Sequence, residues 1–528
     1  MTLLSITYGI FLLSVLGLYW LQEARSLRLG ILLLASLVFY ASLQIQYLPL
    51  LLVMALIAFG FGRQIAAAPL PMEHFQPADA AAGKGTSKAT RKPVADGVSS
   101  NGKAGTGPSA VRAMPQLNRR LVLLWLGIGL QVAVLVGFKY LGFLFTTAGS
   151  IIGLPLFTIG AERVASIIAP LGISYFVFEC IAYLVDTYRG APAARNLLQF
   201  LAYKLFFPKL LSGPITRYHT VEGQLAHRLP LRLEQSVDGL WLIAVGALKK
   251  LLLADHLATL VNLSFGNLER AGSGDIWLAV LAYGLQLYFD FSGYVDVARG
   301  SGILLGVYLP ENFRGPYFST SIADFWRRWH ITLGNWLRNY LYFPLGGSRQ
   351  GLLRTCFNLI IVMVVAGIWH NPGWGFVIWG LIHGVALAAH RLTEYFSQRS
   401  PAAADFWARP PGVLLGWGLT QVTVFFSWIF FRLPEPSAYG LALNRLVGQS
   451  ADIQFAAKIY QEGLQVSRPQ AIAMVVAVIV GMAVVQAFKQ GLKVQFNWYL
   501  KIALVPLLIY LAWLLAPSES LPYIYFDF

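Results

Sequence analysis

Long apolar stretches separated by short polar links dominate the hydrophobic pattern of this chain. A stretch of about 20 apolar residues crosses a bilayer as a helix. The pattern predicts an all-α polytopic membrane protein with about eleven or twelve such helices. Shorter or proline-interrupted pieces are expected as re-entrant or interfacial helices. The expected spans are 1–21, 29–43, 47–61, 121–140, 164–185, 236–253, 276–297, 355–367, 375–391, 411–431, 471–487 and 498–515, and the expected re-entrant pieces are 151–159 and 197–211.

Composition supports a lipid environment for most of the surface. The chain is 57% hydrophobic and only 12% charged, whereas a soluble globular protein carries roughly 25% charged residues. The lipid bilayer is therefore a predicted partner of the whole chain.

One segment, from 62 to 118, breaks the apolar pattern. It is rich in Ala, Gly, Ser, Lys and Pro, as in GKGTSKATRKP, and such a segment cannot bury enough surface to fold. We predict a disordered basic linker between the N-terminal helices (1–61) and a membrane core (119–528). The positive-inside rule places this linker and the basic link at 22–28 in the cytoplasm and the N-terminus outside. The first stretch has no basic start or small-residue cleavage site, so it is expected to remain as a helix.

The net charge of +16 has a simple origin that does not involve nucleic acid. Residues 63–120 contain nine Lys or Arg and three Asp or Glu, so this segment alone supplies +6. Most of the remainder lies beside apolar runs, as expected for membrane topology. Cys180 and Cys356 each lie in an apolar run and belong to no metal-spaced cluster, so neither a disulfide framework nor a metal site is predicted.

The stretch 319–391 carries the chemistry. It contains four of the eight histidines, His330, His370, His383 and His390, together with six of the fifteen tryptophans. A histidine at membrane depth is costly and marks a functional site by default. Ser321 and Asp324 have the spacing that opens a helix, and we expect that helix to place Trp326 and His330 one turn apart.

His370 is the strongest candidate for a catalytic group. An apolar helix over 355–367 delivers it, and Asn371-Pro372-Gly373-Trp374 ends that helix. Burial keeps an imidazole neutral, as a general base requires. The alternative is a satisfied core histidine. His383 is interpreted as support and His390 as a residue at the interface.

The arginines near His330 have two open interpretations. Asp324 can pair with Arg327 or Arg328 on the same helical surface. The guanidinium groups suit the phosphates of a cytosolic donor, or they anchor the helix to lipid headgroups. The glycine-rich segment 345–351 is a turn and lacks the lysine of a phosphate-binding loop.

Polar residues in other apolar stretches are interpreted as structural. We expect Glu179 to be hydrogen-bonded between helices and Lys139 to reach the membrane interface. Asp290 and Asp296 are six residues apart and do not share a helix face. They are expected to anchor a helix break at Ser292-Gly293.

The motifs DFWRRWHITLGNWLRNYLYFPLGG and GIWHNPGWGFVIWGLIHG resemble the signature of the membrane-bound O-acyltransferase (MBOAT) family, in particular its bacterial branch that acetylates alginate and other polysaccharides. PLGISYFVFECIAYLVDTYRG, LFFPKLLSGPITRY, YFDFSGYVDVARG and the terminal LPYIYFDF extend the match over most of the chain. Asn339 departs from the family pattern, which commonly has Asp there.

The resemblance implies an MBOAT core that encloses a tunnel, in a bacterial cytoplasmic (inner) membrane. It implies transfer of an acetyl group from acetyl-CoA, or from another acyl thioester, to an exported polysaccharide of the alginate, cellulose or related type. A periplasmic acetyltransferase partner often completes that transfer. No bound cofactor is implied.

The family's two histidines fall on His370 and His330. We expect His370 to act as base or relay acceptor and His330 to orient or shuttle a proton. Trp369 and Trp374 are expected to wall the acyl pocket. The residues expected to bind substrate or donor are Trp326, Arg327, Arg328, Trp329, Trp369, Asn371 and Trp374.

Two rival functions remain open. A flippase for polysaccharide or lipid-linked sugar would need more charges along a path and a repeat symmetry, and the chain has little of either. An acyltransferase with another acceptor, in teichoic acid D-alanylation or on lipid, is the second rival.

Overall fold

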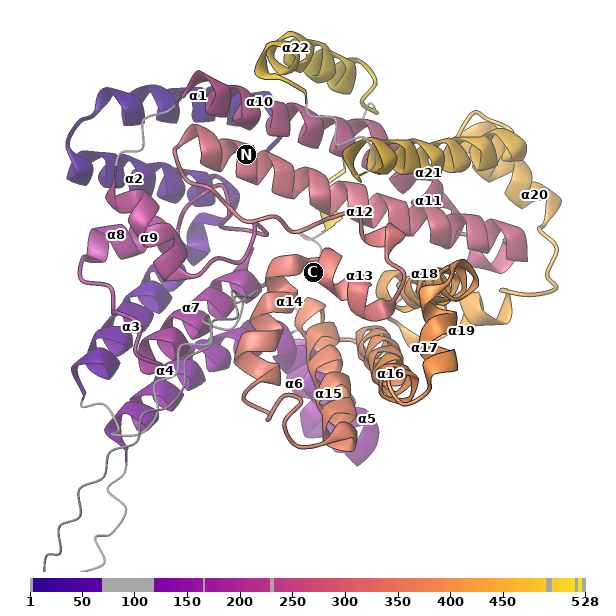
Figure 1. Ribbon diagram of the computed structural model, residues 1–528, viewed down its shortest axis with the longest axis horizontal. Coiled ribbons are helices and arrows are strands. Elements are labelled where there is room, and N and C mark those ends of the chain that lie inside the picture. The colour runs from indigo at the N-terminus through magenta and orange to yellow at the C-terminus, as the bar shows by residue number, and fades with distance from the viewer. Residues whose placement is uncertain are drawn as a thin grey trace, which may run out of the picture.

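The computed structural model describes residues 3–68, 118–164, 167–227, 232–490, 496–517 and 521–524. Within these ranges the chain forms helices and connecting turns and no strand. The predicted all-α class is therefore confirmed. Figure 1 shows that the helices lie in several directions around one long central helix, α12.

Three N-terminal helices form the edge of the molecule. They are α1 (Ile6–Leu21), α2 (Arg25–Gln44) and α3 (Leu48–Ala67), and a short 3₁₀ turn at Ile45–Tyr47 joins the last two. Helix α3 continues six residues past the expected end of the apolar stretch at residue 61. Within this extension, Gly62 packs directly against the ring of Tyr183 on α7. The first residues of the predicted linker, 62–67, are therefore part of α3. Its residues 69–117 lie outside the described ranges.

After the linker, a second group of helices returns to the membrane. Asn118 caps the first of them by accepting hydrogen bonds from the backbone of Arg120 and Leu121. This group consists of α4 (Arg119–Leu135), a π-helical turn (Val136–Tyr140), α5 (Leu141–Ile152), α6 (Pro155–Val164), α7 (Ile173–Tyr188), α8 (Leu197–Lys204) and α9 (Tyr218–Ala226).

A buried polar cluster around Glu179 shapes this group. The expected span 164–185 is shorter than predicted because α7 begins only at Ile173. The interruption expected within 197–211 is confirmed, since α8 ends at Lys204. Lys204 and Lys209 both pair with Glu179, at 3.3 and 2.6 Å. Glu179 therefore has the structural, hydrogen-bonded role that was predicted for it.

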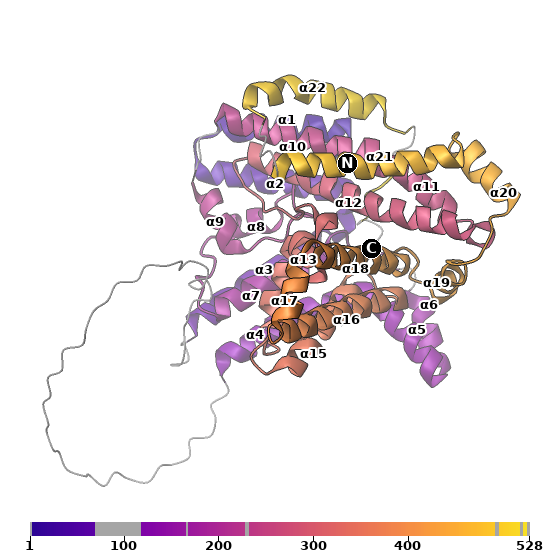
Figure 2. The same ribbon diagram turned by 45° about the vertical axis from the view of Figure 1, so that its right-hand side comes forward.

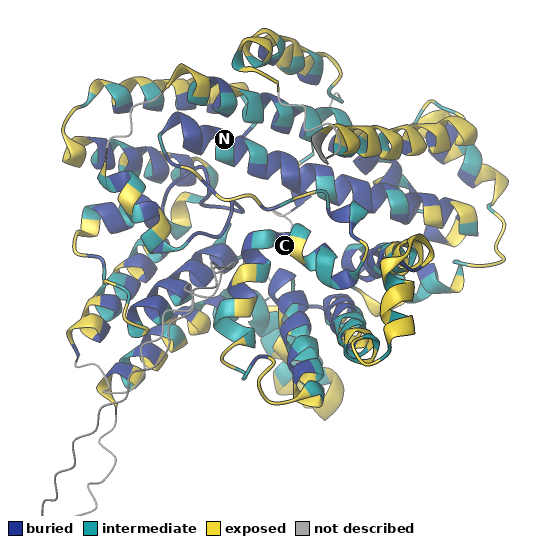
Figure 3. Cartoon of the chain, viewed as in Figure 1, coloured by how far each residue is buried: buried dark blue, intermediate teal, exposed yellow. Residues whose placement is uncertain are grey.

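The central part of the chain is built on α12 (Ser273–Leu304), which is buried along most of its length (Figure 3). It follows α10 (Leu233–Ala247), a π-helical turn (Leu248–Ala254), α11 (Asp255–Phe265) and a 3₁₀ turn (Leu268–Arg270).

The helix break expected at Ser292-Gly293 is wrong, because α12 continues through it. A Cβ at Gly293 would lie 2.9 Å from the carbonyl oxygen of Gly246, so the glycine allows α12 to approach α10. The predicted anchoring is confirmed: Asp290 binds Lys250 at 2.7 Å and Asp296 binds Lys249 at 2.6 Å.

The stretch 319–391 forms two short helices followed by a long hairpin. Its elements are a 3₁₀ turn (Pro316–Phe318), α13 (Ile322–Arg328), α14 (Ile331–Leu337), a π-helical turn (Arg338–Tyr342), α15 (Leu352–His370) and α16 (Trp374–Ser397). The segment before α15 is a turn, as predicted, and contains Gly346 and Gly347 at positive φ. In the hairpin, Gly367 of α15 contacts the backbone of Phe376 and Gly380 of α16. This close approach fixes the register of the two helices beside His370.

The C-terminal helices cover the outside of the core. They are α17 (Pro401–Ala408), α18 (Pro410–Arg432), α19 (Pro436–Asn444), α20 (Ile453–Ala456), a π-helical turn (Ala457–Gly463), α21 (Arg468–Gln490) and α22 (Trp498–Leu514). In Figures 1 and 2, α22 lies at the upper rim above α10, whereas α21 lies lower, beside α12.

Six helical stretches in the described ranges are long and apolar enough to cross a membrane. They are 25–67, 119–152, 352–370, 374–397, 410–432 and 468–488, and Ile6–Leu21 and Trp498–Leu514 are shorter apolar helices. This is fewer than the eleven or twelve spans expected from the sequence. The first stretch combines α2 and α3, and several core helices, such as α7, are too short to count. The chain is a multi-pass membrane protein.

Candidate functional site

His330 lies at a break between two helices and not within one helix, as the sequence analysis expected. Helix α13 ends at Arg328, Trp329 is extended, and His330 has φ 42° and ψ 55°. Such left-handed backbone is costly for a residue with a Cβ. The loop around Asn312 holds it there: the Ile331 amide donates to the Asn312 carbonyl at 3.0 Å, and the Thr332 hydroxyl donates to the Asn312 side chain at 2.7 Å. The expected one-turn spacing of Trp326 and His330 is therefore wrong.

The His330 side chain is fully buried. The Tyr175 hydroxyl lies 3.5 Å from its Nε2 atom, and the Phe291 ring packs on it at a centroid distance of 4.8 Å. His330 lies outside the six candidate spans. Burial lowers the pKa of this imidazole to about 3, because an apolar environment disfavours the charged ring. At neutral pH the ring is therefore neutral.

His370 is the last residue of α15, and Lys139 holds this helix end. The Lys139 ammonium donates to the backbone carbonyls of His370 at 2.7 Å and of Trp369 at 3.0 Å. The carbonyls that end a helix lack intrahelical partners and carry partial negative charge, so they attract a cation. The expectation that Lys139 only reaches the membrane interface is therefore wrong: it fixes the backbone that carries His370.

Trp369 brings the two predicted histidines together. Its ring centroid lies 4.9 Å from that of His370 and 6.3 Å from that of His330. Tyr175 packs on Trp369 at 5.1 Å and also contacts His330. Two residues that are 40 positions apart in the chain thus share one aromatic neighbour.

The other side of the His370 ring is enclosed by aromatic side chains. Trp379 and Phe431 pack on it at centroid distances of 5.3 and 5.1 Å. His383 packs on Trp379 at 4.8 Å, and its Nε2 lies 2.9 Å from the Ser427 hydroxyl. His383 is therefore one aromatic layer away from His370.

A cavity of about 350 Å³ reaches this cluster. His370, Trp369, Tyr175, Ser174 and Lys139 line it, and so does Gln44 from the end of α2. Because α3 leads from this point to the linker, the cavity lies at the end of the helices opposite to the linker. Its lining combines the polar groups of Ser174 and Lys139 with aromatic side chains next to His370.

The residues predicted to bind substrate do not all lie at this cavity. Trp369 lines it, and Asn371 follows His370 as the extended residue that ends α15. Trp374 is 46% exposed and packs on Phe143 at 5.8 Å. It does not line the cavity, because α16 begins there and directs its first residue outward.

Trp326 and Trp329 belong to the protein interior around the histidines. Trp326 packs on His383 at 5.2 Å and on Trp379 at 5.8 Å. Trp329 is buried and packs on Phe313 at 5.1 Å. Neither tryptophan lines the cavity beside His370.

The predicted pairing of Asp324 with the arginines is confirmed. Arg328 binds Asp324 at 2.8 Å, and Arg327 lies 3.6 Å from it. The Arg327 side chain is 69% exposed, whereas that of Arg328 is 27% exposed. Arg327 is thus the more accessible of the two cations.

Tyr175 is a site residue that the sequence analysis missed. Its only signal was a tyrosine near the start of an apolar stretch, and aromatic residues are common there. Its contact with His330 spans 155 positions of the chain, and no local pattern encodes such a contact.

A column of aromatic rings connects the histidines to the linker side of the molecule. Phe178 stacks on Trp369 at 5.0 Å and on Trp336 at 3.6 Å, and Tyr340 packs on Trp336 at 5.3 Å. Arg189 and Arg217 lie over the ring of Tyr340, at 5.5 and 5.4 Å.

The outer end of this column lies near the start of α4, directly after the linker. Arg120 donates to the backbone carbonyls of Thr187 and Tyr188, which end α7. The column and the cavity therefore approach the histidines from opposite sides.

Comparison with known proteins identifies this arrangement. The model of the MBOAT, membrane-bound O-acyltransferase family matches residues 128–417, a range that contains both histidines. The chain belongs to this family, and it is a membrane-embedded O-acyltransferase.

Three relatives are informative. The probable alginate O-acetylase AlgI of Azotobacter vinelandii is 37% identical over 80% of this chain and 73% of its own length. The probable alginate O-acetylase AlgI of Pseudomonas putida is 35% identical over 80% of this chain and 75% of its own length. The peptidoglycan O-acetyltransferase of Helicobacter pylori is 36% identical over 62% of this chain and 65% of its own length.

Proposed function

We propose that this protein transfers an acetyl group from a cytosolic thioester, such as acetyl-CoA, toward a hydroxyl of an exported polysaccharide. The transfer is either direct or relayed through a periplasmic acetyltransferase. Relatives named as O-acetylases of alginate and of peptidoglycan support this choice of acceptor class. The observation that carries the proposal is the meeting of His330 and His370 on Trp369, beside a cavity with polar lining.

The proposed chemistry is one acyl transfer with one proton transfer. His370 accepts the proton of the attacking hydroxyl, and the hydroxyl oxygen forms a bond to the thioester carbonyl carbon. The carbon–sulfur bond then breaks, and His370 returns its proton to the leaving thiolate. An ester and a free thiol result. His330, through its contact with Tyr175, orients the acceptor side of the site.

The position of the linker supports the direction of transfer. With a cytoplasmic linker, the outer end of the aromatic column, at Arg189 and Arg217, faces the cytosol. Guanidinium groups bind phosphates well, so this end suits a phosphate-bearing thioester donor. The cavity beside His370 then faces the opposite side of the membrane, where an exported polysaccharide or a partner enzyme arrives.

Inverted membrane vesicles that contain this protein provide the test, because their cytosolic face is outward. We expect labelled acetyl-CoA, added outside, to leave ester-bound label on polysaccharide or on an acetyltransferase partner within the vesicles. The matched control is His370→Gln vesicles with an equal amount of membrane protein, and these should stay unlabelled.

The same assay separates the rival functions. Label from a D-alanyl thioester, with none from acetyl-CoA, would show that the transferred group is D-alanyl and not acetyl. Vesicles that move polysaccharide but never carry label would favour a flippase. Labelling that is equal with and without His370 would refute the assigned base.

A further inference from the structure

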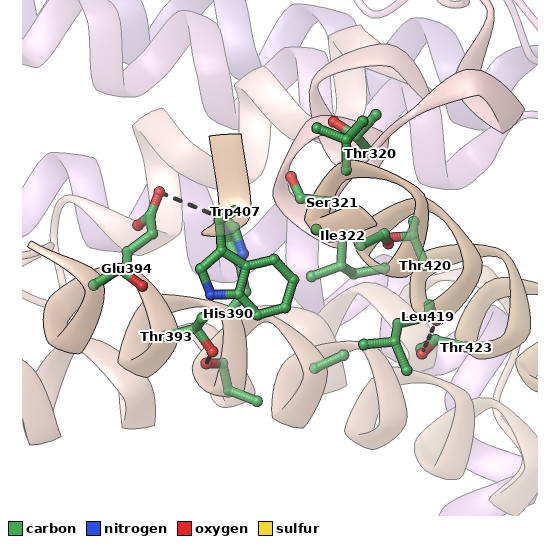
Figure 4. A pocket seen from close by; sticks show the side chains of 16 residues that line it. Thr320, Ser321, Ile322, His390, Thr393, Glu394, Trp407, Leu419, Thr420 and Thr423 are labelled. Atoms are coloured by element: carbon green, nitrogen blue, oxygen red, sulfur yellow. Dashed lines mark hydrogen bonds and ion pairs between the residues drawn. The ribbon is translucent and has the colours of Figure 1, made fainter. Parts of the chain in front are cut away.

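A second cavity, of about 490 Å³, lies away from the histidine cluster, between α16, α17, α18 and the segment before α13. Figure 4 shows its lining: Ile322, Leu419 and Thr420 lie on one side, and His390, Thr393 and Glu394 lie on the other, with Trp407 between them. None of these residues has a part in the acyl transfer proposed above.

The mouth of this cavity faces the bilayer. It opens between α16 and α18, which are both candidate membrane spans. Two of its lining residues on α18, Val413 and Leu419, are 38% and 55% exposed. Apolar side chains that remain exposed on a membrane-spanning helix face lipid, so the lining of this cavity is accessible from the bilayer.

The polar lining is rich in hydrogen-bond acceptors. The hydroxyls of Thr393, Thr420 and Thr423 each donate to a backbone carbonyl one turn earlier, at 3.0, 2.7 and 2.8 Å. Their oxygen atoms therefore remain able to accept. Glu394 adds a carboxylate that is 45% exposed, so the lining selects a ligand that donates hydrogen bonds.

Both positively and negatively charged side chains surround the cavity. The Glu394 carboxylate lies 3.5 Å from His390 and 3.1 Å from Arg391. Arg327, whose side chain is 69% exposed, lies on α13, and the first residue of this helix, Ile322, lines the cavity. Trp407 adds an aromatic face, which attracts an ammonium group. A zwitterionic headgroup with a phosphate and an ammonium matches this set.

We propose that this cavity binds a bilayer phospholipid with a primary ammonium headgroup. An acyl chain occupies the apolar side, near Ile322 and Leu419. The ammonium lies between Glu394 and Trp407, and the phosphate faces Arg327. A primary ammonium donates N–H bonds to Glu394 and to the threonine oxygens, whereas a trimethylammonium group has no proton to donate.

Native mass spectrometry of the purified full-length protein tests the headgroup. The protein in detergent is titrated with phosphatidylethanolamine, phosphatidylcholine and phosphatidylglycerol that have identical acyl chains. We expect the ethanolamine lipid to bind about tenfold more tightly than the other two, as charge-assisted hydrogen bonds of this kind allow. Glu394→Gln should reduce this preference to less than about threefold. Equal affinities in the unmodified protein would overturn the proposal.

Two further variants test the location. Ala389→Trp places a large side chain in the cavity from an exposed position on α16 and should abolish the adduct. Leu414→Trp is the control, since Leu414 is 66% exposed on α18 and does not line the cavity.

A photoactivatable ethanolamine phospholipid gives an independent measurement. It should label peptides from α16 and α18 in the full-length protein, and excess unlabelled lipid should remove the label. Labelling confined to other helices, or an unchanged adduct in Ala389→Trp, would overturn the site.

Discussion

His370→Gln is the sharpest test of the proposed site. The His370 side chain is 4% exposed and packs on Trp369, Trp379 and Phe431. Glutamine keeps a polar side chain of related size in this position but cannot accept a proton in catalysis. A positioned general base contributes about 10²–10⁴-fold to a rate. We therefore expect the acetylation rate to fall by about that factor, which corresponds to about 3–5 kcal/mol of activation free energy.

The expected effect on folding is much smaller. Lys139 binds the backbone carbonyl of residue 370 and not its side chain, so the end of α15 keeps its anchor in the variant. The lost ring contacts should cost about 1–2 kcal/mol of stability, and the protein should accumulate in the membrane.

His383→Gln is the matched control, because His383 is equally buried and packs on the same Trp379. It loses or weakens the hydrogen bond to Ser427, at a cost of about 1 kcal/mol. It does not line the cavity beside His370. Its acetylation rate per molecule should stay within about threefold of the unmodified protein, since it contributes no proton transfer.

The assay is the ester-linked acetyl content of exported polysaccharide, divided by the amount of protein in the membrane. Thermal unfolding of each purified variant in detergent shows how much of any loss is structural. A His370→Gln protein that keeps more than about a tenth of the rate would refute the assignment of the base. Equal losses in both variants would show that the aromatic cluster acts only through packing.

Two further predictions concern His330 and the α15–α16 hairpin. The folded pKa of His330, about 3, is below its unfolded value of about 6.5, so the unfolded chain binds the extra proton between these values. The stability due to His330 is complete above pH 6.5 and is lost toward pH 3, by up to about 1.4 kcal/mol per pH unit. Between pH 6.5 and 4, the melting temperature of His330→Gln should therefore fall less steeply than that of the unmodified protein. Parallel curves of melting temperature against pH for the two proteins would contradict this. Gly367→Ala should destabilise the protein by about 1–3 kcal/mol, because the new methyl group meets the carbonyl oxygen of Phe376. Gly129→Ala is its control, because this glycine of α4 has open space around it. Thermal unfolding of this variant should show a gain in stability of about 0.5–1 kcal/mol. Equal losses of stability in both variants would rule out the helix contact as the cause.

The class of the protein and its main candidate residues follow from local patterns in the sequence. The length of the apolar stretches depends on the bilayer thickness, so the all-α membrane fold follows from a local pattern. The cost of a histidine at membrane depth is also local, and it indicates His370, at the end of the candidate span 352–370. The pairing of Asp324 with Arg328 was predictable for the same reason, since residues four positions apart share a helix face.

The way in which these residues meet depends on contacts that form only in the folded protein. The left-handed backbone of His330 is held by Asn312, and a helical pattern that continues through residues 322–337 gives no sign of it. Lys139 is 231 positions from His370 along the chain. The Lys139 ammonium binds carbonyls of a kind that every helix end offers. Nothing in the segment around Lys139 therefore distinguishes it from a lysine at the membrane interface. The two histidines become one site because α7, α14 and α15 pack their aromatic side chains around Trp369, and such packing depends on long-range contacts that no local pattern of the sequence contains.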